Sequence, residues 1–379
     1  MWKAMAIALP IALLWGFSGA VQAANSHEAV ITISQGALAG QVDAHGVRSF
    51  KGIPYAEPPI GDKRWTAPVA AGPWKGVRDA HEFGASCFET SYSPQSLFNV
   101  HPPKLSEDCL FLNVWMPPHA KKAPVIVWIH GGSFVRGGTW EPQYEGTHFA
   151  EHGVVFVTVN YRLSPRSTWP DHIVDCKRAL AWVHEHIAAY GGDPTFVAVS
   201  GGSAGGHLAA LAALTPGDPA FQPGFEALDT SVAACVPFYG VYDMTADETG
   251  TGKYGSDLKH LVEKEVMKVD IDGHRRLFEE ASPDYRVNPG APPFFVLHGT
   301  HDTLVPVESA RRFVGNLRAT TLAPVVYAEL PLAQHAFDLL ATPRCRATTA
   351  GVQMFLEALV GRSARPEADG GERTDAARP

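Results

Sequence analysis

The sequence lacks the positive charge that a nucleic-acid-binding protein needs. Only 18% of its 379 residues are charged, the formal net charge is −8, and no block of lysine and arginine occurs. Affinity for nucleic acid rests on cations that neutralise phosphates, so we expect no nucleic-acid partner. No internal repeat is present, and a hydrophobic share of 45% argues against disorder over most of the chain. A globular protein with a large core is therefore expected.

Cysteine is too scarce for a disulfide scaffold. In an exported chain, 5 cysteines allow one or two disulfides and leave at least one free thiol. One of them falls in a helical pattern and another in a strand-like run, so we interpret Cys176 and Cys235 as small buried hydrophobes. The full set is Cys87, Cys109, Cys176, Cys235 and Cys345.

A recognisable set of metal ligands is missing as well. His298 and His301 flank Asp302 at a strand end, where their spacing lacks the one-face helical geometry of a zinc site. No upstream group of cysteines or histidines completes such a site. We therefore expect neither a metal nor another cofactor.

Long apolar runs are absent except for one at the start. Lys3 precedes an apolar stretch to about Phe17, and small residues follow up to Ala23. This layout is typical of a secretory signal cleaved after Ala23. The alternative is an uncleaved membrane anchor, but a proline, a glycine and a serine interrupt the run. We expect a signal peptide at 1–23, no stable membrane insertion after cleavage, and a secreted or periplasmic location.

Apolar strand patterns alternate with helical patterns along the later part of the chain. Such alternation predicts a mostly parallel sheet with helices on both faces. No helix separates the first three strands, which are expected to form an antiparallel N-terminal extension. The expected strands are 29–33, 46–50, 110–116, 123–132, 154–162, 196–202, 232–240, 293–299 and 325–331, and the expected helices are 175–189, 203–214, 308–319 and 345–360.

A single α/β domain at 24–362 accounts for these elements. Within it, about 245–291 is an insertion that contains a charged helical stretch at 256–269. An insertion of this length is typical of a lid over an active site, although an excursion without function is the alternative. The tail at 363–379 has no apolar period and is predicted to be disordered.

A serine between pairs of glycines marks the candidate nucleophile. The segment 201–205, Gly-Gly-Ser-Ala-Gly, fits G-x-S-x-G and lies between a strand and a helix, where that pattern operates. The glycines permit a sharp turn that holds Ser203 Oγ at the carboxyl edge of the sheet, beside a helix N-terminus. Glycine-rich turns of this kind also bind phosphates, so only the partner residues of Ser203 can distinguish a nucleophile from a phosphate-binding turn.

Those partners are expected after two later strands. A serine hydroxyl needs a base, and the base needs an orienting acid. Asp302 follows the strand at 293–299, and His335 follows the strand at 325–331. Asp243 also follows a strand and is the alternative acid. Asp338 lies too near His335 in sequence to orient the ring easily, so we interpret it as a surface or helix-capping residue.

Donors for an oxyanion are expected in two places. The strand at 123–132 leads into His130-Gly131-Gly132-Ser133, a turn that can aim successive N–H groups into the site. The N–H of Ala204, next to the nucleophile, would complete the set.

With these residues in place, 30–360 resembles an α/β-hydrolase-fold esterase. The segments 50–65 (FKGIPYAEPPIGDKRW) and 106–117 (SEDCLFLNVWMP) resemble type-B carboxylesterases. Later segments are similar to the hormone-sensitive-lipase-like bacterial esterases: NYRLSP, YGGDP, SGGSAGGHLA, HGTHDTLVP and QHAFD. The resemblance implies Ser203 as nucleophile, Asp302 as acid and His335 as base. It also implies Gly132, Ser133 and Ala204 as oxyanion donors, and a disulfide between Cys87 and Cys109.

The chain departs from these families at several points. Both families usually carry an acidic residue before the nucleophile, where this chain has Gly202. Ser133 replaces a usual third glycine, and its side chain narrows the pocket. Type-B enzymes typically use glutamate as the acid, and their large insertions are missing from this shorter chain.

The resulting hypothesis is a serine carboxylesterase that takes a small-molecule ester, of short to medium acyl chain, and water. An amide hydrolase of the aryl-acylamidase or formamidase type would use the same residues, and a non-catalytic binding protein on this fold is a further alternative. Four aromatic side chains are candidates for the acyl pocket, although buried aromatics are often plain core. They are Phe134, Trp140, Tyr239 and Tyr242. The sequence leaves the oligomeric state open.

Overall fold

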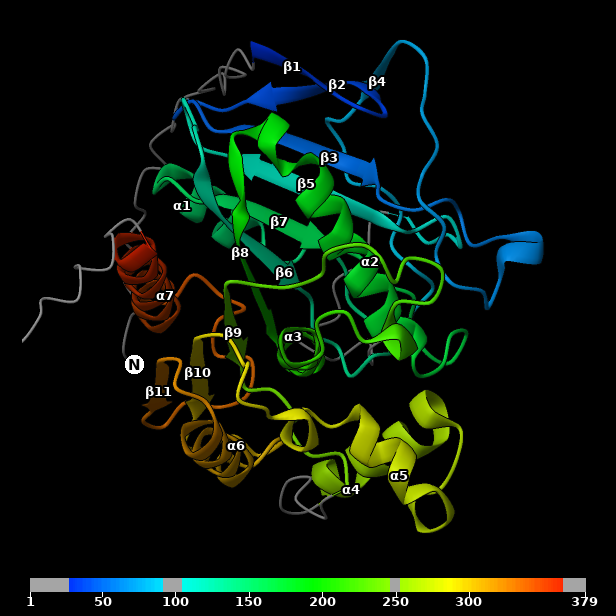
Figure 1. Ribbon diagram of the computed structural model, residues 1–379, viewed down its shortest axis with the longest axis vertical. Coiled ribbons are helices and arrows are strands. Elements are labelled where there is room, and N and C mark those ends of the chain that lie inside the picture. The colour runs from blue at the N-terminus through cyan, green and yellow to red at the C-terminus, as the bar shows by residue number, and fades with distance from the viewer. Residues whose placement is uncertain (1–26, 91–103, 246–252, 364–379) are drawn as a thin grey trace, which may run out of the picture.

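An 11-stranded sheet runs through the molecule, in the order β1-β2-β3-β5-β7-β6-β8-β9-β10-β11, with β4 paired to β2. The computed structural model describes residues 27–90, 104–245 and 253–363. The expected signal peptide, and the expected tail beyond Ser363, lie outside the described residues. Figure 1 shows the N-terminal strands at one end of the sheet and β10 and β11 at the other.

The N-terminal strands form the expected antiparallel extension. They are β1 (His27–Ile33), β2 (Gly36–Val42), β3 (Arg48–Pro54) and β5 (Phe111–Met116), and the short β4 (Val77–Asp79) lies parallel to β2. The sequence patterns missed β2 because glycine and alanine make up most of its first five residues and have low strand propensity. Tertiary pairing overrides that propensity, since all seven residues of β2 pair with β1.

The remaining strands run parallel to one another, as predicted. They are β6 (Ala123–Ile129), β7 (Val155–Val159), β8 (Gly192–Gly202), β9 (Ala234–Phe238), β10 (Phe294–Gly299) and β11 (Val325–Leu330). β7 and β9 are buried at every residue, because helices cover both faces of the sheet. This explains their near-continuous apolar sequences.

Helices pack on the two faces of the sheet in separate groups. One hydrophobic cluster joins the sheet to α2 (Asp171–His186), α3 (Ala204–Leu214) and α6 (Val307–Thr320). The other joins it to α1 (Gln143–Glu151) and α7 (Pro343–Ser363), which lie together on the opposite side (Figure 1). The sequence patterns did not predict α1. No helix in the described ranges combines the length and apolar character that crossing a membrane requires.

The insertion after β9 forms its own helical segment at the lower end of Figure 1. It contains α4 (Lys253–Leu261), a π-helix at Val262–Met267 and α5 (Ile271–Ala281). The first two correspond to the charged stretch expected at 256–269, whereas α5 was not predicted. A short 3₁₀ turn at Pro283–Arg286 also lies in the insertion, and others span Gly61–Lys63, Ile187–Tyr190 and Pro219–Phe221.

The cysteines divide as the sequence suggested. Cys87 and Cys109 form a disulfide, which confirms the pairing that the resemblance implied. Cys176, Cys235 and Cys345 are free and buried. The bond joins the loop before residue 90 to the residues just before β5. Thr90 in turn donates its N–H to Val135, in the loop that follows β6.

Candidate active site

Ser203 occupies a strained turn between β8 and α3. Its backbone φ of 57° and ψ of −119° lie in a region that residues with a Cβ rarely adopt. The flanking backbone is packed so closely that a Cβ on Gly205 would collide with the carbonyl oxygen of Ile129 in β6. Only glycine permits this approach, and the result is a serine held out at the carboxyl edge of the sheet.

The three residues predicted to act together are joined by hydrogen bonds. Ser203 Oγ lies 2.8 Å from His335 Nε2, and His335 Nδ1 lies 2.7 Å from Asp302 Oδ2. Each residue follows a different parallel strand, namely β8, β11 and β10. Parallel strands end at one edge of the sheet, which is why residues separated by 132 positions meet.

The environment of Asp302 favours its ionised form. Burial by itself would raise the pKa of Asp302, but hydrogen bonds from His298, His335 and the Val305 N–H hold it well below its ordinary value. Asp302 Oδ1 also accepts the N–H of Leu304 at 2.9 Å. A carboxylate anchored on one oxygen and bonded to His335 through the other is suited to orient the imidazole.

The alternative candidates make no hydrogen bond to His335 among the contacts of the described residues, although Asp243 lines the cavity beside Ser203. Asp243 accepts hydrogen bonds from the N–H and hydroxyl of Thr245, at 2.7 Å each, and faces Arg312. His298 is fully buried, and its Nε2 lies 2.9 Å from the carbonyl oxygen of Val305, so it supports the Asp302 loop. His301 contacts Thr300 at the surface. In the described part of the chain, no group of three or more His, Cys, Asp or Glu side chains is arranged to hold a metal ion.

The interpretation of Asp338 as a surface or capping residue is wrong. Its side chain is only 5% exposed and accepts a hydrogen bond from the hydroxyl of Tyr239, on the turn after β9. Short-range sequence patterns could not reveal this contact, because its two members are 99 positions apart.

The loop after β6 lies directly against the nucleophile turn. A Cβ on Gly131 would come within 2.7 Å of the Gly202 carbonyl oxygen, and Ser133 lines the same cavity as Ser203 and Ala204. Gly132, Ser133 and Phe134 have positive φ values of 101°, 55° and 65°, so this is a sharply turned loop. Ala204 begins α3, and its N–H therefore has no acceptor within the helix.

Two residues that the sequence analysis did not single out brace this loop. Glu89 Oε2 accepts the N–H of Gly137 at 2.8 Å. The buried side chain of Asn160 accepts the N–H of Thr139 at 3.0 Å and donates to the carbonyl oxygen of Cys109 at 3.1 Å. Asn160 opens the NYRLSP segment used in the resemblance, and that segment is the signal that could have identified it.

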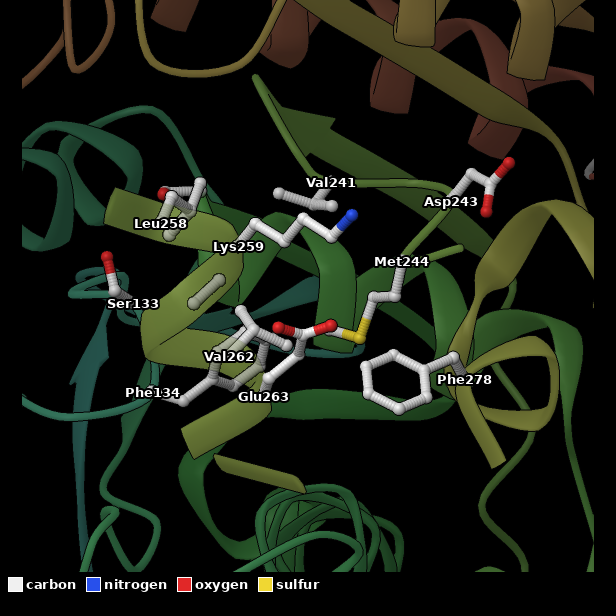
Figure 2. Close-up of a pocket in the computed structure, with 12 residues that line it drawn as sticks. Ser133, Phe134, Val241, Asp243, Met244, Leu258, Lys259, Val262, Glu263 and Phe278 are labelled. Atoms are coloured by element: carbon white, nitrogen blue, oxygen red, sulfur yellow. The ribbon is translucent and has the colours of Figure 1, made fainter. Parts of the chain in front are cut away.

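A small apolar cavity opens beside Ser203, with a volume of about 30 Å³. Figure 2 shows that the segment from α4 to the π-helix brings Leu258, Val262 and Glu263 over it. Phe134 lines the cavity, as expected. Tyr239 and Tyr242 do not line it; they are buried in the core, where Tyr242 stacks on Phe313. Nor is Trp140 among the described residues that line it.

Comparison with known families agrees with this architecture. Residues 27–222 match the model of the carboxylesterase family, and residues 126–339 match a model of the alpha/beta hydrolase fold. A solved structure of PNB esterase superposes with a TM-score of 0.65 at 23% identity, covering 90% of this chain and 92% of that one. This likeness shows the fold.

Two relatives from Mycobacterium tuberculosis are similar in sequence. LipM, described as a probable carboxylic ester hydrolase, is 51% identical over 251 residues, which are 65% of this chain and 57% of LipM. The esterase LipQ is 48% identical over 255 residues, which are 66% of this chain and 60% of LipQ. The aligned part of this chain thus spans less than two thirds of either relative.

Proposed function

The chain belongs to the carboxylesterase family, and on that premise we propose that it hydrolyses carboxylic esters through an acyl intermediate on Ser203. The observation that carries the proposal is the continuous hydrogen-bonded series from Asp302 through His335 to Ser203. The descriptions of LipM and LipQ as an ester hydrolase and an esterase support it.

The proposed reaction follows from the order in which these three side chains are hydrogen-bonded. His335 Nε2 takes the proton of Ser203 Oγ while the oxygen attacks the ester carbonyl. The carbonyl oxygen becomes an oxyanion, which in this proposal accepts hydrogen bonds from the N–H groups of Gly132, Ser133 and Ala204. His335 then passes its proton to the leaving alcohol. Water enters, and His335 takes a proton from it as the water oxygen attacks the acyl ester. The tetrahedral intermediate then releases the acid while His335 returns the proton to Ser203 Oγ.

The acyl group is proposed to be short to medium in length. The side chains around the cavity are mostly apolar, and they include Phe134, Val241, Met244 and Phe278 (Figure 2). The cavity is small, with a volume of about 30 Å³, and the α4 segment covers it. A longer acyl chain would therefore have to displace the side chains of the α4 segment, and we propose that this limits its length.

Substitution of the nucleophile tests the proposal. Ser203→Ala and His335→Ala are expected to abolish hydrolysis of p-nitrophenyl esters while the far-UV circular dichroism stays unchanged. A fluorophosphonate probe should label the wild type and fail to label Ser203→Ala. Retained turnover in folded Ser203→Ala would refute the assignment.

A substrate panel tests the substrate class. Esters of increasing acyl length should show kcat/KM falling beyond medium chains, and matched anilides should be poorer substrates. Anilides that exceed the esters would indicate an amide hydrolase instead.

We also propose that the protein acts outside the cytoplasm. The signal-like layout of residues 1–23 and the disulfide between Cys87 and Cys109, a bond characteristic of oxidising compartments, support this location. N-terminal sequencing of the mature protein should begin at Ala24, and a mature protein that retains Met1 would contradict the cleavage.

A further inference from the structure

The space that a side chain at position 202 would occupy is taken by a residue from another strand end. A Cβ on Gly202 would lie 2.8 Å from the hydroxyl oxygen of Tyr239. Tyr239 is 3% exposed and lies on the turn immediately after β9. The absence of a side chain at position 202 therefore makes room for the Tyr239 hydroxyl.

Tyr239 also contacts the base and a residue just beyond it. Its ring centroid lies 4.6 Å from that of His335, and its hydroxyl donates to the buried carboxylate of Asp338. Its backbone N–H donates to the Leu297 carbonyl oxygen at 2.8 Å, which fixes the tyrosine to β10. One rigid side chain thus touches the nucleophile turn, the base and the loop that carries the base.

The loop that carries His335 is held on both sides of the histidine. Before it, the Leu332 N–H donates to Thr300 Oγ1 at 2.9 Å, and the His301 N–H donates to the Ala333 carbonyl oxygen at 3.0 Å. After it, Ala336 has a φ of 59°, in the left-handed region that alanine rarely adopts. The hydrogen bond from Tyr239 to Asp338 holds the chain on the far side of this unfavourable turn.

We propose that Tyr239 and Asp338 are positioning residues for His335, in a site where Gly202 leaves room for the Tyr239 hydroxyl. The proposal rests on the proposed function of Ser203 and His335. Tyr239 fixes the loop after His335 through Asp338 and limits the tilt of the imidazole through ring contact. Without the pair, the imidazole is free to leave the line between Asp302 and Ser203, so fewer encounters with substrate are productive.

Three variants separate the contribution of the Tyr239 hydroxyl from that of its acceptor, Asp338. Tyr239→Phe keeps the ring and removes the hydroxyl, Asp338→Ala removes the acceptor, and Asp338→Asn keeps an oxygen that accepts the hydrogen bond. We expect Tyr239→Phe and Asp338→Ala each to lower kcat about tenfold, the factor that one hydrogen bond's net contribution supplies, with KM unchanged. Asp338→Asn should lose much less. The double variant Tyr239→Phe with Asp338→Ala should be no slower than either single variant, because both remove the same contact.

Tyr190→Phe provides the matched control. Tyr190 is fully buried, and within the described residues its hydroxyl has no hydrogen-bond partner. Loss of that hydroxyl should leave kcat and KM unchanged. The melting temperature and the far-UV spectrum of each variant report whether it is folded, and kcat is expressed per serine labelled by the fluorophosphonate probe.

A substitution at Gly202 tests the same contact from the other side. Gly202→Ala places a methyl group against the Tyr239 hydroxyl without removing any hydrogen-bonding group. We expect kcat to fall, and the factor by which it falls should be smaller in the Tyr239→Phe background, where the closest atom is absent.

The outcomes separate this proposal from the proposed function. Wild-type kcat in both Tyr239→Phe and Asp338→Ala, or a lowered melting temperature with kcat unchanged, would overturn the positioning role. If the wild type hydrolysed no ester, the proposed function would fail. The rate at which the fluorophosphonate labels Ser203 would still test the positioning of His335, and it should fall in Tyr239→Phe and not in Tyr190→Phe.

Discussion

The loops that carry Ser203, Asp302 and His335 differ from the loop after β6 in how they are held. The loops of Ser203, Asp302 and His335 each follow a parallel strand and are joined to one another through their side chains. Asp302 accepts hydrogen bonds from two backbone N–H groups and is bonded to His335. The loop after β6 is shaped by backbone conformation, with positive φ values at Gly132, Ser133 and Phe134. Its anchors come from the N-terminal part of the chain.

Those anchors connect the loop after β6, called the turned loop below, to the disulfide. Thr90 donates its N–H to the Val135 carbonyl oxygen at 2.9 Å, and Glu89 accepts the Gly137 N–H. Both residues follow Cys87 closely, and Asn160 joins the loop to Cys109. One side of the site, with Asp302 and His335, therefore depends on charged catalytic groups. The other side, the loop after β6, depends on the disulfide and on hydrogen bonds to its backbone. Substitutions on the two sides should have different kinds of effect.

The largest effect is expected on the side held by charged groups. Asp302→Asn should lower kcat by about 10⁴, because an amide cannot fix the imidazole tautomer or stabilise the imidazolium. Stability should change less, since the amide oxygen can still accept the N–H groups of Leu304 and Val305. Steady-state kinetics together with thermal melting measure the two effects.

Asp243→Asn is the matched comparison for that change. Asp243 bonds to Thr245 and faces Arg312, and it makes no hydrogen bond to His335 among the contacts of the described residues. Its kcat should stay close to wild type. A steep loss in Asp243→Asn with little loss in Asp302→Asn would reassign the acid.

Sequence patterns were informative where function depends on local geometry. The glycines around Ser203, and strands that end before Asp302 and His335, are visible in short segments, and the structure brings these three residues within hydrogen-bonding distance. The parallel order of the strands follows from their alternation with helices. These features are encoded by neighbours in the chain.

The features that were missed depend on distant neighbours. β2 has a weak strand sequence and exists because β1 and β3 flank it. Asp338 resembles a surface residue until Tyr239 is placed beside it. The aromatic side chains expected in the acyl pocket include two that form core instead, since composition does not distinguish a pocket wall from an interior.

The next largest effect concerns the disulfide that supports the loop after β6. The double variant Cys87→Ser with Cys109→Ser opens a loop whose ends are 22 positions apart, which should lower the free energy of unfolding by about 3 kcal/mol. The turned loop should become less ordered, so kcat should also fall, though by less than the roughly hundredfold cost of losing an oxyanion donor. Denaturant unfolding and ester kinetics measure the two changes.

Reduction of the wild type provides the control for the disulfide. A reductant should reproduce the loss of stability in the wild type and leave the double variant unaffected, because the remaining cysteines are free. Unchanged stability in the double variant would show that the hydrogen bonds of Asn160 and Glu89 hold the loop without the disulfide.

The smallest effect is a pH dependence of the free energy of unfolding, and it concerns Glu145, which lies near Asp338. Glu145 of α1 shares an internal cavity with Asp338, and burial raises its pKa to about 7. The folded state therefore favours the protonated acid. The resulting stability is complete below the unfolded value near pH 4.5 and is lost as pH rises through about 7. Glu145→Gln resembles the protonated form, so at about pH 8 its free energy of unfolding should exceed that of the wild type by about 3 kcal/mol. At about pH 4.5 the two proteins should have the same free energy of unfolding.

Glu280→Gln is the control, an exposed change on α5. Its free energy of unfolding should differ from that of the wild type by no more than about 0.5 kcal/mol at both pH values. A Glu145→Gln effect that is equal at both pH values would show that the fold does not raise the pKa of Glu145.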